Sequence, residues 1–183
     1  MTEPIYLIGY MGAGKSTVGK LLADLLGWHF VDLDEAFHEV NGISVADFIT
    51  RFGIEAFRKR EKDCVETLSD LPIQNVVYAT GGGYPCWEDN MECLNELGTT
   101  VYLRWSNEHL ARRVELSGTE HRPLLRGKSG KELEEFIRWQ MSGREEFYAQ
   151  AKHIVDAPLD GKLHPDNDAH LAEYIKNLLE QKK

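Results

Sequence analysis

The sequence predicts an α/β protein in which a five-stranded parallel sheet forms the middle of three layers and helices cover both of its faces. Two observations support this fold class. Short apolar runs alternate with segments of helical periodicity along the 183 residues. Residues suited to ligand chemistry follow the apolar runs, and in parallel sheets ligands gather at the carboxyl ends of the strands. A hydrophobic fraction of 42% fits a single domain, residues 1–183, with one sizeable core.

The first strand is expected at residues 5–8, because four apolar or aromatic residues in a row suit a strand that is buried on both faces. Apolar side chains then recur at helical spacing from Val18 to Leu25, which predicts a helix that ends at Gly27. A second strand is expected at residues 29–31. This order of strand, helix and strand is the repeating unit of a parallel sheet.

Three further helices are expected at residues 34–41, 45–52 and 54–68, with Ser44 as the cap of the middle one and Gly53 as its end. The remaining expected strands are residues 76–79, 100–103 and 153–155. The remaining expected helices are residues 88–97, 107–116 and 131–148, together with a terminal helix that carries Leu171, Ile175, Leu178 and Leu179. Residues 118–130 form the one long irregular stretch of the sequence.

Composition argues against several classes of protein. A formal net charge of −9 disfavours a nucleic-acid binder, which needs a basic face. No apolar run approaches the roughly 18 residues of a membrane span, and residues 1–4 lack the features of a signal peptide, so we expect a cytoplasmic location and no membrane partner. Cys64, Cys86 and Cys93 form no C-x-x-C pair, which disfavours a disulfide framework or a zinc site. We expect the chain to act as a monomer.

The residues after the first expected strand spell a phosphate-binding loop, G-x-x-x-x-G-K-[ST], with Gly9, Gly14, Lys15 and Ser16 at its fixed positions. Glycines there and at Gly12 let the backbone N–H groups turn inward toward phosphate oxygens. Lys15 is expected to bind the β- and γ-phosphates, and Ser16 to ligate Mg²⁺. A glycine-rich turn that only joins a strand to a helix is the alternative. The strand before and the helix after favour a nucleoside triphosphate site.

Two carboxylates, Asp32 and Asp34, follow the second expected strand. If the chain stays extended there, both side chains leave on the same side, so that one can orient Mg²⁺ while the other meets an acceptor hydroxyl. The alternative is that Asp34 caps the next helix. Three glycines, residues 81–83, follow the third expected strand. They exceed what a turn needs and favour a ligand lying against bare backbone N–H groups.

Arginines outside the phosphate-binding loop are less informative when each is taken alone. Arg58 lies on a helical stretch where charges are usually solvated, and Arg144 by itself indicates nothing. Arg122 lies within residues 112–131, which hold six basic residues and two acidic ones. Such a segment suits an anionic ligand, and Arg122 stands where a closing lid would bring a cation over a transferring phosphate.

Taken jointly and in order, these motifs resemble the shikimate kinase family. They are Gly-x-Met-Gly-Ala-Gly-Lys-Ser-Thr (9–17), Asp-x-Asp (32–34), Phe-Arg-x-x-Glu (57–61), Gly-Gly-Gly (81–83), Arg-Pro-Leu-Leu (122–125) and Arg-x-x-x-Tyr (144–148). The resemblance runs from the first strand to about residue 156. It implies a three-layer P-loop kinase fold with a substrate-binding helical segment at about residues 33–61 and a mobile lid at about residues 114–130.

The resemblance also implies an activity, the ATP-dependent, Mg²⁺-assisted phosphorylation of shikimate at its 3-hydroxyl, giving shikimate 3-phosphate and ADP on the route to chorismate and aromatic amino acids. The implied catalytic residues are Lys15, Asp34 and Arg122. The implied ATP-binding residues are Gly12, Ala13, Gly14, Lys15, Ser16, Thr17, Arg122 and Arg113, the last against the adenine. The implied shikimate-binding residues are Asp34, Gly81, Gly82 and Gly83, with Arg58 and Arg144 on the carboxylate. The implied Mg²⁺-binding residues are Ser16 and, through water, Asp32.

Two segments depart from the family pattern. Residues 84–87, Tyr-Pro-Cys-Trp, are bulkier than the small residues expected after the three glycines, and residues 116–120 reshape the approach to the lid. Three alternatives stay open: another P-loop kinase of a hydroxylated acid such as gluconate, a nucleoside monophosphate kinase, and a non-enzymatic regulator that binds ATP. Paired arginines with Asp-x-Asp suit a hydroxylated acid better than a nucleotide acceptor.

Overall fold

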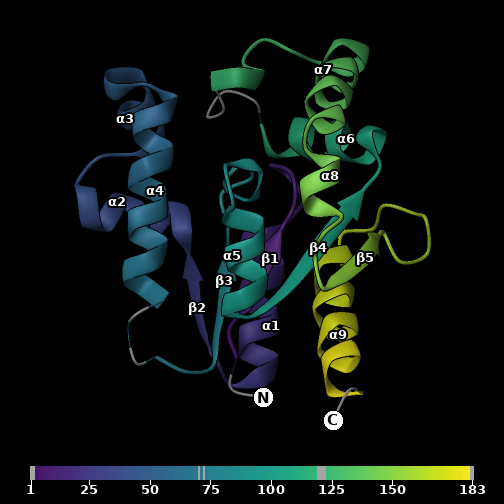
Figure 1. Ribbon diagram of the computed structural model, residues 1–183. Coiled ribbons are helices and arrows are strands. Elements are labelled where there is room, and N and C mark those ends of the chain that lie inside the picture. The colour runs from purple at the N-terminus through teal and green to yellow at the C-terminus, as the bar shows by residue number, and fades with distance from the viewer. Residues whose placement is uncertain (1–2, 70, 72, 119–122, 182–183) are drawn as a thin grey trace.

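The computed structural model describes residues 3–69, 71, 73–118 and 123–181. Its centre is the predicted five-stranded parallel sheet, with strand order β2-β3-β1-β4-β5 (Figure 1). The strands are β1 (Ile5–Ile8), β2 (His29–Asp32), β3 (Val76–Ala79), β4 (Thr99–Trp105) and β5 (His153–Ala157). Because the strands run in one direction, their carboxyl ends meet at one edge of the sheet, where ligands of such folds bind.

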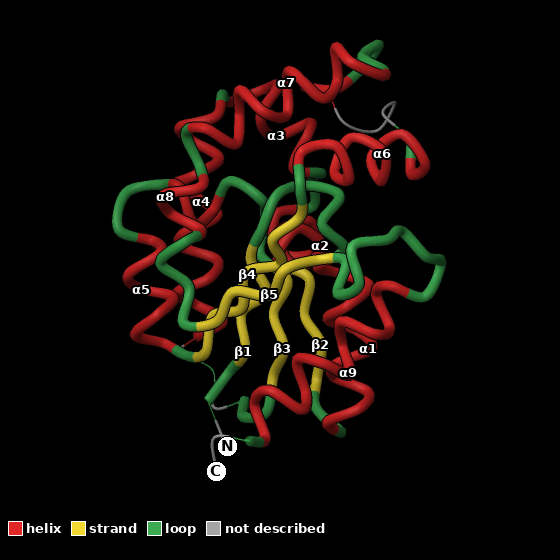
Figure 2. Tube along the Cα trace, turned by 90° about the vertical axis from the view of Figure 1, so that its right-hand side faces the viewer, coloured by secondary structure: helices red, strands yellow, loops and turns green. Residues whose placement is uncertain are grey.

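Helices cover both faces of the sheet, which gives the three predicted layers (Figure 2). One face carries α1 (Lys15–Leu26) and α9 (Asn167–Glu180), which pack against each other, and the other carries α5 (Asn90–Leu97). Beside β2 lie α2 (Leu33–Asn41), α3 (Val45–Phe52) and α4 (Ile54–Ser69). Beyond the carboxyl ends lie α6 (Asn107–Ser117) and α7 (Gly130–Ser142), and shorter turns of helix are η1 (Tyr84–Cys86), η2 (Pro123–Leu125) and α8 (Glu145–Tyr148).

The central strands are buried on both faces. Ile5, Leu7 and Ile8 of β1 have no exposed surface, and Val77 of β3 and Val101 of β4 are equally buried. Each such side chain contributes roughly 1.5–3 kcal/mol when it leaves water. This burial explains why the strands appear in the sequence as uninterrupted apolar runs rather than as alternating apolar and polar residues.

The helices beside β2 have a small apolar cluster of their own. Phe37 of α2 and Phe57 of α4 are buried in it with Cys64, and the ring of Phe48 meets that of Phe37 edge-on at 5.2 Å between centroids. The cluster joins α2, α3 and α4 into one unit. Because Phe57 is anchored there, the backbone of its neighbour Arg58 is held in place.

The expected helix at residues 131–148 was wrong, since the structure has two helices there, α7 and α8. Gly143 ends α7, and its N–H bonds only three residues back, to the carbonyl of Gln140 at 3.3 Å. Side chains on both sides of this break are buried, so the apolar pattern of the sequence continues across the break and gives no sign of it. They are Leu133, Ile137, Met141 and Tyr148.

Two further boundaries differ from the expectation. The helix expected at 88–97 begins only at Asn90, and residues Tyr84–Cys86 before it form a separate 3₁₀ turn, η1. The cap of α2 is Asp32 rather than Asp34, because the Asp32 carboxylate accepts a hydrogen bond from the Asp34 N–H at 3.0 Å. The chain therefore turns into a helix after Asp32 instead of staying extended through Asp34.

Among the residues that the structure describes, no helix combines the length and the apolar character that crossing a membrane requires.

Candidate active site

The loop between β1 and α1 has the conformation that its glycines allow. Gly9, Gly12 and Gly14 have φ angles of 141°, 84° and 88°, a region that side-chain-bearing residues rarely adopt. Space is short as well, because a Cβ at Gly12 would lie 2.7 Å from Cγ2 of Val114. The loop leads directly into α1, so the partly positive end of that helix lies at its base.

Lys15 is buried inside this loop. Its Nζ donates hydrogen bonds to the carbonyls of Gly9 and Tyr10, at 2.9 and 3.0 Å. The ammonium is thereby held at the centre of the curve that the loop makes, where phosphate oxygens would meet it.

A cavity of about 690 Å³ opens beside the loop. Its lining includes Gly12, Gly14, Lys15, Ser16 and Thr17 from the loop and the start of α1. It also includes Arg112, Arg113, Leu116 and Ser117 from α6, and Leu163, His164 and Pro165 from the segment before α9. Ala13 is buried beneath the loop, and its carbonyl accepts a hydrogen bond from Nε1 of Trp105 at 3.0 Å. The cavity has the size and the basic, glycine-rich wall that a nucleoside triphosphate needs.

Ser16 and Asp32 meet at the mouth of this loop. The Ser16 hydroxyl donates to Oδ2 of Asp32 at 2.5 Å, and both side chains remain accessible to solvent. Mg²⁺ prefers oxygen ligands and usually takes only one or two from the protein, with the rest from phosphates and water. This hydroxyl and carboxylate therefore fit a magnesium ion shared with a bound nucleotide.

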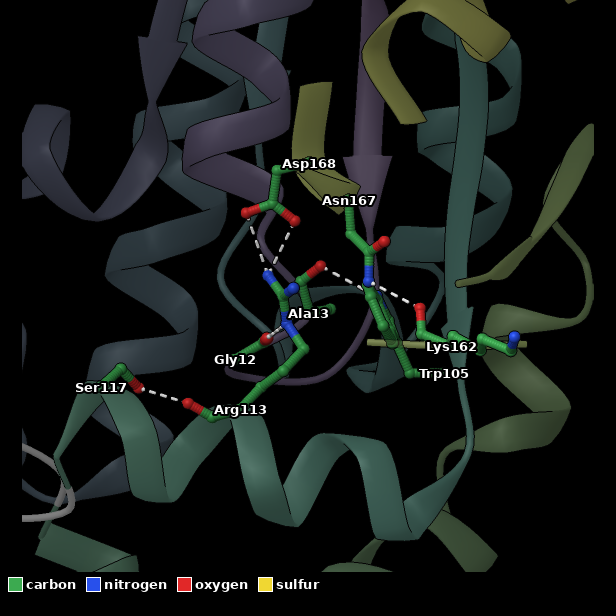
Figure 3. Close-up of polar contacts among 8 residues, drawn as sticks. All are labelled: Gly12, Ala13, Trp105, Arg113, Ser117, Lys162, Asn167 and Asp168. Carbon is green, nitrogen blue, oxygen red and sulfur yellow. Dashed lines mark hydrogen bonds and ion pairs between the residues drawn. The ribbon is translucent and has the colours of Figure 1, made fainter. Parts of the chain in front are cut away.

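Arg113 of α6 extends its side chain to the loop at Gly12 (Figure 3). Its Nε donates to the carbonyl of Gly12 at 2.8 Å, and its Nη2 lies 2.8 and 3.0 Å from the two carboxylate oxygens of Asp168. Its guanidinium carbon lies 4.3 Å from the centre of the Trp105 ring. Arg113 therefore joins the loop to β4, α6 and α9.

Asp34 lies in the first turn of α2, outside the lining of the cavity that Arg113 borders. It keeps contact with solvent, yet the surrounding protein removes enough of its hydration to raise its pKa, and the nearby charge of Asp32 raises the pKa further. Lys15 and Arg58 oppose this rise. A carboxylate whose pKa is raised in this way accepts a proton more readily than a free aspartate does.

Arg58 and Glu61, one turn apart on α4, lie against the three glycines that follow β3. A Cβ at Gly83 would lie 2.0 Å from Nη2 of Arg58, and a Cβ at Gly81 would lie 2.5 Å from Oε1 of Glu61 and 3.2 Å from Oδ1 of Asp34. Glycine at these two positions leaves the space that the three charged side chains occupy.

Gly82, between them, packs against the phosphate-binding loop. A Cβ there would lie 3.2 Å from the backbone nitrogen of Met11 and 3.4 Å from the carbonyl oxygen of Gly9. On its other side, the Gly82 carbonyl accepts a hydrogen bond from the hydroxyl of Tyr148. The three glycines thus form a strip of bare backbone between the loop on one side and Arg58 on the other.

Arg144 approaches the same strip from the turn between α7 and α8. Its guanidinium carbon lies 5.3 Å from the centre of the Tyr10 ring. Both Arg144 and Arg58 lower the pKa of the Cys86 thiol, against the larger effect of burial, which raises it. The thiol of η1 therefore lies within electrostatic reach of both guanidinium groups.

The structure brings most of the residues singled out in the sequence to one edge of the sheet. Gly12, Gly14 to Thr17 and Arg113 border the cavity, and Asp34, Arg58, Arg144 and the three glycines lie near one another outside its lining. Arg122 lies outside the described residues. No group of three or more histidine, cysteine or acidic side chains suited to a metal occurs in the described part of the chain.

Four residues with evident structural roles in the site were assigned none from the sequence: Glu61, Trp105, Tyr148 and Asp168. Glu61 and Tyr148 belong to motifs quoted above, which was a usable signal. Trp105 and Asp168 gave no such signal, because each acts through a contact with a residue far away in the sequence.

Known proteins resemble this chain in sequence and in fold. A model of the shikimate kinase family matches residues 11–179. The shikimate kinase of Parabacteroides distasonis is 43% identical over 166 residues, which cover 91% of this chain and 92% of that protein. The crystal structure of shikimate kinase from Bacteroides thetaiotaomicron matches with a TM-score of 0.88 and 37% identity over 98% of this chain and 99% of that one. Shikimate kinase from Acinetobacter baumannii, in complex with shikimate, matches with a TM-score of 0.84 and 30% identity over 100% and 96%.

Proposed function

The chain belongs to the shikimate kinase family, and from this membership and the geometry of the site we infer how it phosphorylates shikimate with ATP. The reaction takes the terminal phosphoryl group of ATP to the 3-hydroxyl of shikimate and leaves ADP. Phosphoryl transfer depends mainly on positioning and on charge neutralisation, so the assignment of residues follows from where each charge and each donor lies.

One observation carries the assignment. At Gly82 the glycine strip lies against the phosphate-binding loop, because a Cβ there would lie 3.2 Å from the backbone nitrogen of Met11. At Gly83 the strip lies against the side chain of Arg58. A small acid bound on this strip would have its carboxylate near Arg58 and its hydroxyl near the end of the triphosphate. The two substrates would then meet without any large movement of the sheet edge.

On the nucleotide side, Gly12 to Thr17 hold the phosphates through backbone N–H groups, and Lys15 binds the β- and γ-phosphates. Arg113 lies against the adenine end of the cavity, and Arg122 is the lid cation over the transferring group. Ser16 would hold Mg²⁺ directly and Asp32 would hold it through water. When bound, the ion would neutralise phosphate charge.

On the acceptor side, Arg58 and Arg144 hold the shikimate carboxylate, because guanidinium forks match a planar carboxylate. Gly81, Gly82 and Gly83 present backbone to the ring. Asp34 accepts the proton of the 3-hydroxyl, whose oxygen forms the new bond to phosphorus while the bond from phosphorus to the β–γ bridging oxygen breaks. The raised pKa of Asp34 supports this role as a base.

The same proposal takes residues 1–183 as a single domain, with the acceptor segment at about residues 33–61 and a mobile lid at about residues 114–130. It also takes the protein as a cytoplasmic monomer that acts on small molecules, with no nucleic-acid or membrane partner. The net charge of −9 supports the exclusion of nucleic acid.

The test is a coupled ADP-release assay in which shikimate, quinate, gluconate and nucleoside monophosphates are compared in parallel. We expect the highest kcat/KM with shikimate. Faster ADP release with gluconate or with a nucleoside monophosphate would mean that this compound, and not shikimate, is the acceptor. ATP binding without ADP release on any acceptor would instead indicate a regulator.

A further inference from the structure

Asp168 lies in the first turn of α9, far from the phosphate-binding loop in the sequence but against it in space (Figure 3). A Cβ at Gly14 would lie 2.9 Å from Oδ1 of Asp168. The two carboxylate oxygens lie 2.8 and 3.0 Å from Nη2 of Arg113, and the Asp168 side chain is only 19% exposed. The carboxylate is therefore committed to Arg113 rather than to solvent.

An acidic residue in the first turn of a helix usually needs no further explanation, because it caps the helix or meets its partly positive end. Here both oxygens of Asp168 bond to Arg113, and the N-cap residue, Asp166, makes no side-chain capping bond. Arg113 lines the nucleotide cavity, whereas Asp168 lies behind it and outside the lining. The side-chain hydrogen bonds of Asp168 therefore link it to the nucleotide cavity through Arg113.

Arg113 is fixed from three directions. Besides Asp168, it contacts the Gly12 carbonyl through Nε at 2.8 Å and the Trp105 ring through its guanidinium face at 4.3 Å. Within the part of the chain that the structure describes, its remaining nitrogen, Nη1, makes no hydrogen bond. Nη1 and the face opposite Trp105 stay available to a ligand in the cavity.

We propose that Asp168 is a positioning residue for nucleotide binding, which holds Arg113 against Gly12 and Trp105 with its free face turned to the nucleotide. The proposal rests on the proposed function only in taking this cavity as the ATP site. Without the Asp168 carboxylate, the guanidinium of Arg113 can rotate while keeping its hydrogen bond to the Gly12 carbonyl. The nucleotide must then fix the guanidinium as it binds, and ordering a mobile side chain weakens binding.

The experiment measures the Kd of ADP with Mg²⁺ by titration calorimetry for the parent chain, Asp168→Asn, Arg113→Ala and the double variant. Asn keeps the size of the side chain but removes its charge and one acceptor. Because a charge-assisted hydrogen bond is lost, we expect Asp168→Asn to weaken ADP binding about tenfold and to leave the KM of shikimate unchanged. In the Arg113→Ala background, Asp168→Asn should have no further effect, since its action passes through Arg113.

Asp89→Asn is the matched control. It removes the carboxylate of another close ion pair, Lys62–Asp89 at 2.6 Å, between residues that do not line the nucleotide cavity. We expect unchanged ADP affinity for it. Circular dichroism checks that each variant is folded, and Asp168→Ser, which keeps a small polar residue at the start of the helix, replaces Asp168→Asn if that variant does not fold.

Unchanged or tighter ADP binding by Asp168→Asn would overturn the proposal, and tighter binding would mean that the carboxylate mainly repels phosphate. Additive losses in the double variant would overturn it as well, because they would assign Asp168 a purely structural role. ADP binding needs no acceptor, so this result is independent of whether shikimate is phosphorylated. Whether shikimate is phosphorylated is tested separately, by measuring ADP release by the parent chain with shikimate.

Discussion

Arg58 and Glu61 form an ion pair on the acceptor side of the site, with Nη1 of Arg58 2.5 Å from Oε2 of Glu61. The other oxygen of Glu61, Oε1, is buried and has no hydrogen-bond partner among the described residues. Burial raises the pKa of Glu61 to about 7, although Arg58 acts to lower it. The charge beside Arg58 therefore changes near neutral pH.

We expect the KM of shikimate to fall as the pH is lowered through about 7, the pKa of Glu61. The raised pKa means that Glu61 holds a proton below that pH. A protonated Glu61 neither neutralises Arg58 nor repels the acceptor carboxylate, so the acid binds more tightly. The measurement is the KM of shikimate and of ATP at a series of pH values between about 6 and 8, the window around that pKa.

Glu61→Gln is the variant that checks the cause of this pH dependence. The other charged or titratable groups that act on Glu61 or respond to it are Arg58, Asp34 and Tyr84, and they remain in place. The KM of shikimate should then lose most of its pH dependence. A profile as steep as that of the parent chain would assign the dependence to another group.

Gly83→Ala is expected to fold and to raise the KM of shikimate while leaving the KM of ATP unchanged. The added methyl group would lie 2.0 Å from Nη2 of Arg58, which is the far end of a flexible side chain and can move aside. The substitution is therefore expected to displace the guanidinium of Arg58 and to leave the fold intact. Steady-state kinetics with each substrate varied in turn measures the effect.

Gly143→Ala is the comparison for that variant. A Cβ there meets only the carbonyl of Gln140, at 4.0 Å, and Gly143 has a φ of −98°, which alanine adopts freely. We expect no change in either KM. A rise in the KM of ATP for Gly83→Ala, or an equal effect at both positions, would contradict the placement of Arg58 on the acceptor carboxylate.

Asp34→Asn and Arg58→Ala should abolish phosphoryl transfer and leave ATP binding largely intact. Both side chains lie beyond the phosphate-binding loop, on the acceptor side. Lys15→Ala, in contrast, should weaken ATP binding itself, because Lys15 lies inside the loop. Calorimetric titration with a non-hydrolysable ATP analogue separates the two effects. Equal losses of affinity in all three variants would remove Asp34 and Arg58 from these roles.

Much of the fold could be predicted because its signals are local. A strand buried on both faces appears as an unbroken apolar run, as Ile5–Ile8 does, and the phosphate-binding loop has a fixed spacing of glycines and lysine. Gly143 is the counterexample. It ends a helix, yet the burial of Met141 and Tyr148 on either side continues the apolar period across it.

The site was less predictable because its supporting contacts join distant segments. Tyr148 donates to the carbonyl of Gly82, 66 positions earlier, and Arg113 pairs with Asp168, 55 positions later. No spacing rule connects such residues. In the sequence Asp168 is one of several polar residues at the start of a helix, and only the packing of α9 against α1 brings it to the loop.

Arg122→Ala is expected to lower kcat by roughly 10³-fold or more, the scale for a cation at a phosphoryl-transfer transition state. Arg122 lies outside the described residues, so its role stays a prediction from the basic segment of the sequence. The KM of shikimate should change little, because the carboxylate is assigned to Arg58 and Arg144. An unchanged kcat would remove Arg122 from the lid role.

Alkylation of Cys86 is expected to inactivate the enzyme, and shikimate is expected to slow the inactivation. The thiol lies within electrostatic reach of Arg58 and Arg144, so we expect a bulky adduct there to interfere with an acceptor carboxylate at its proposed place between the two arginines. Burial raises the pKa of the thiol, so reaction with a maleimide should speed up as the pH is raised above neutrality. Cys86→Ser should resist inactivation even though Cys64 and Cys93 are still present. Inactivation of that variant at the parent rate would show that another cysteine is the sensitive one. Modification of Cys86 would then not be the cause of inactivation.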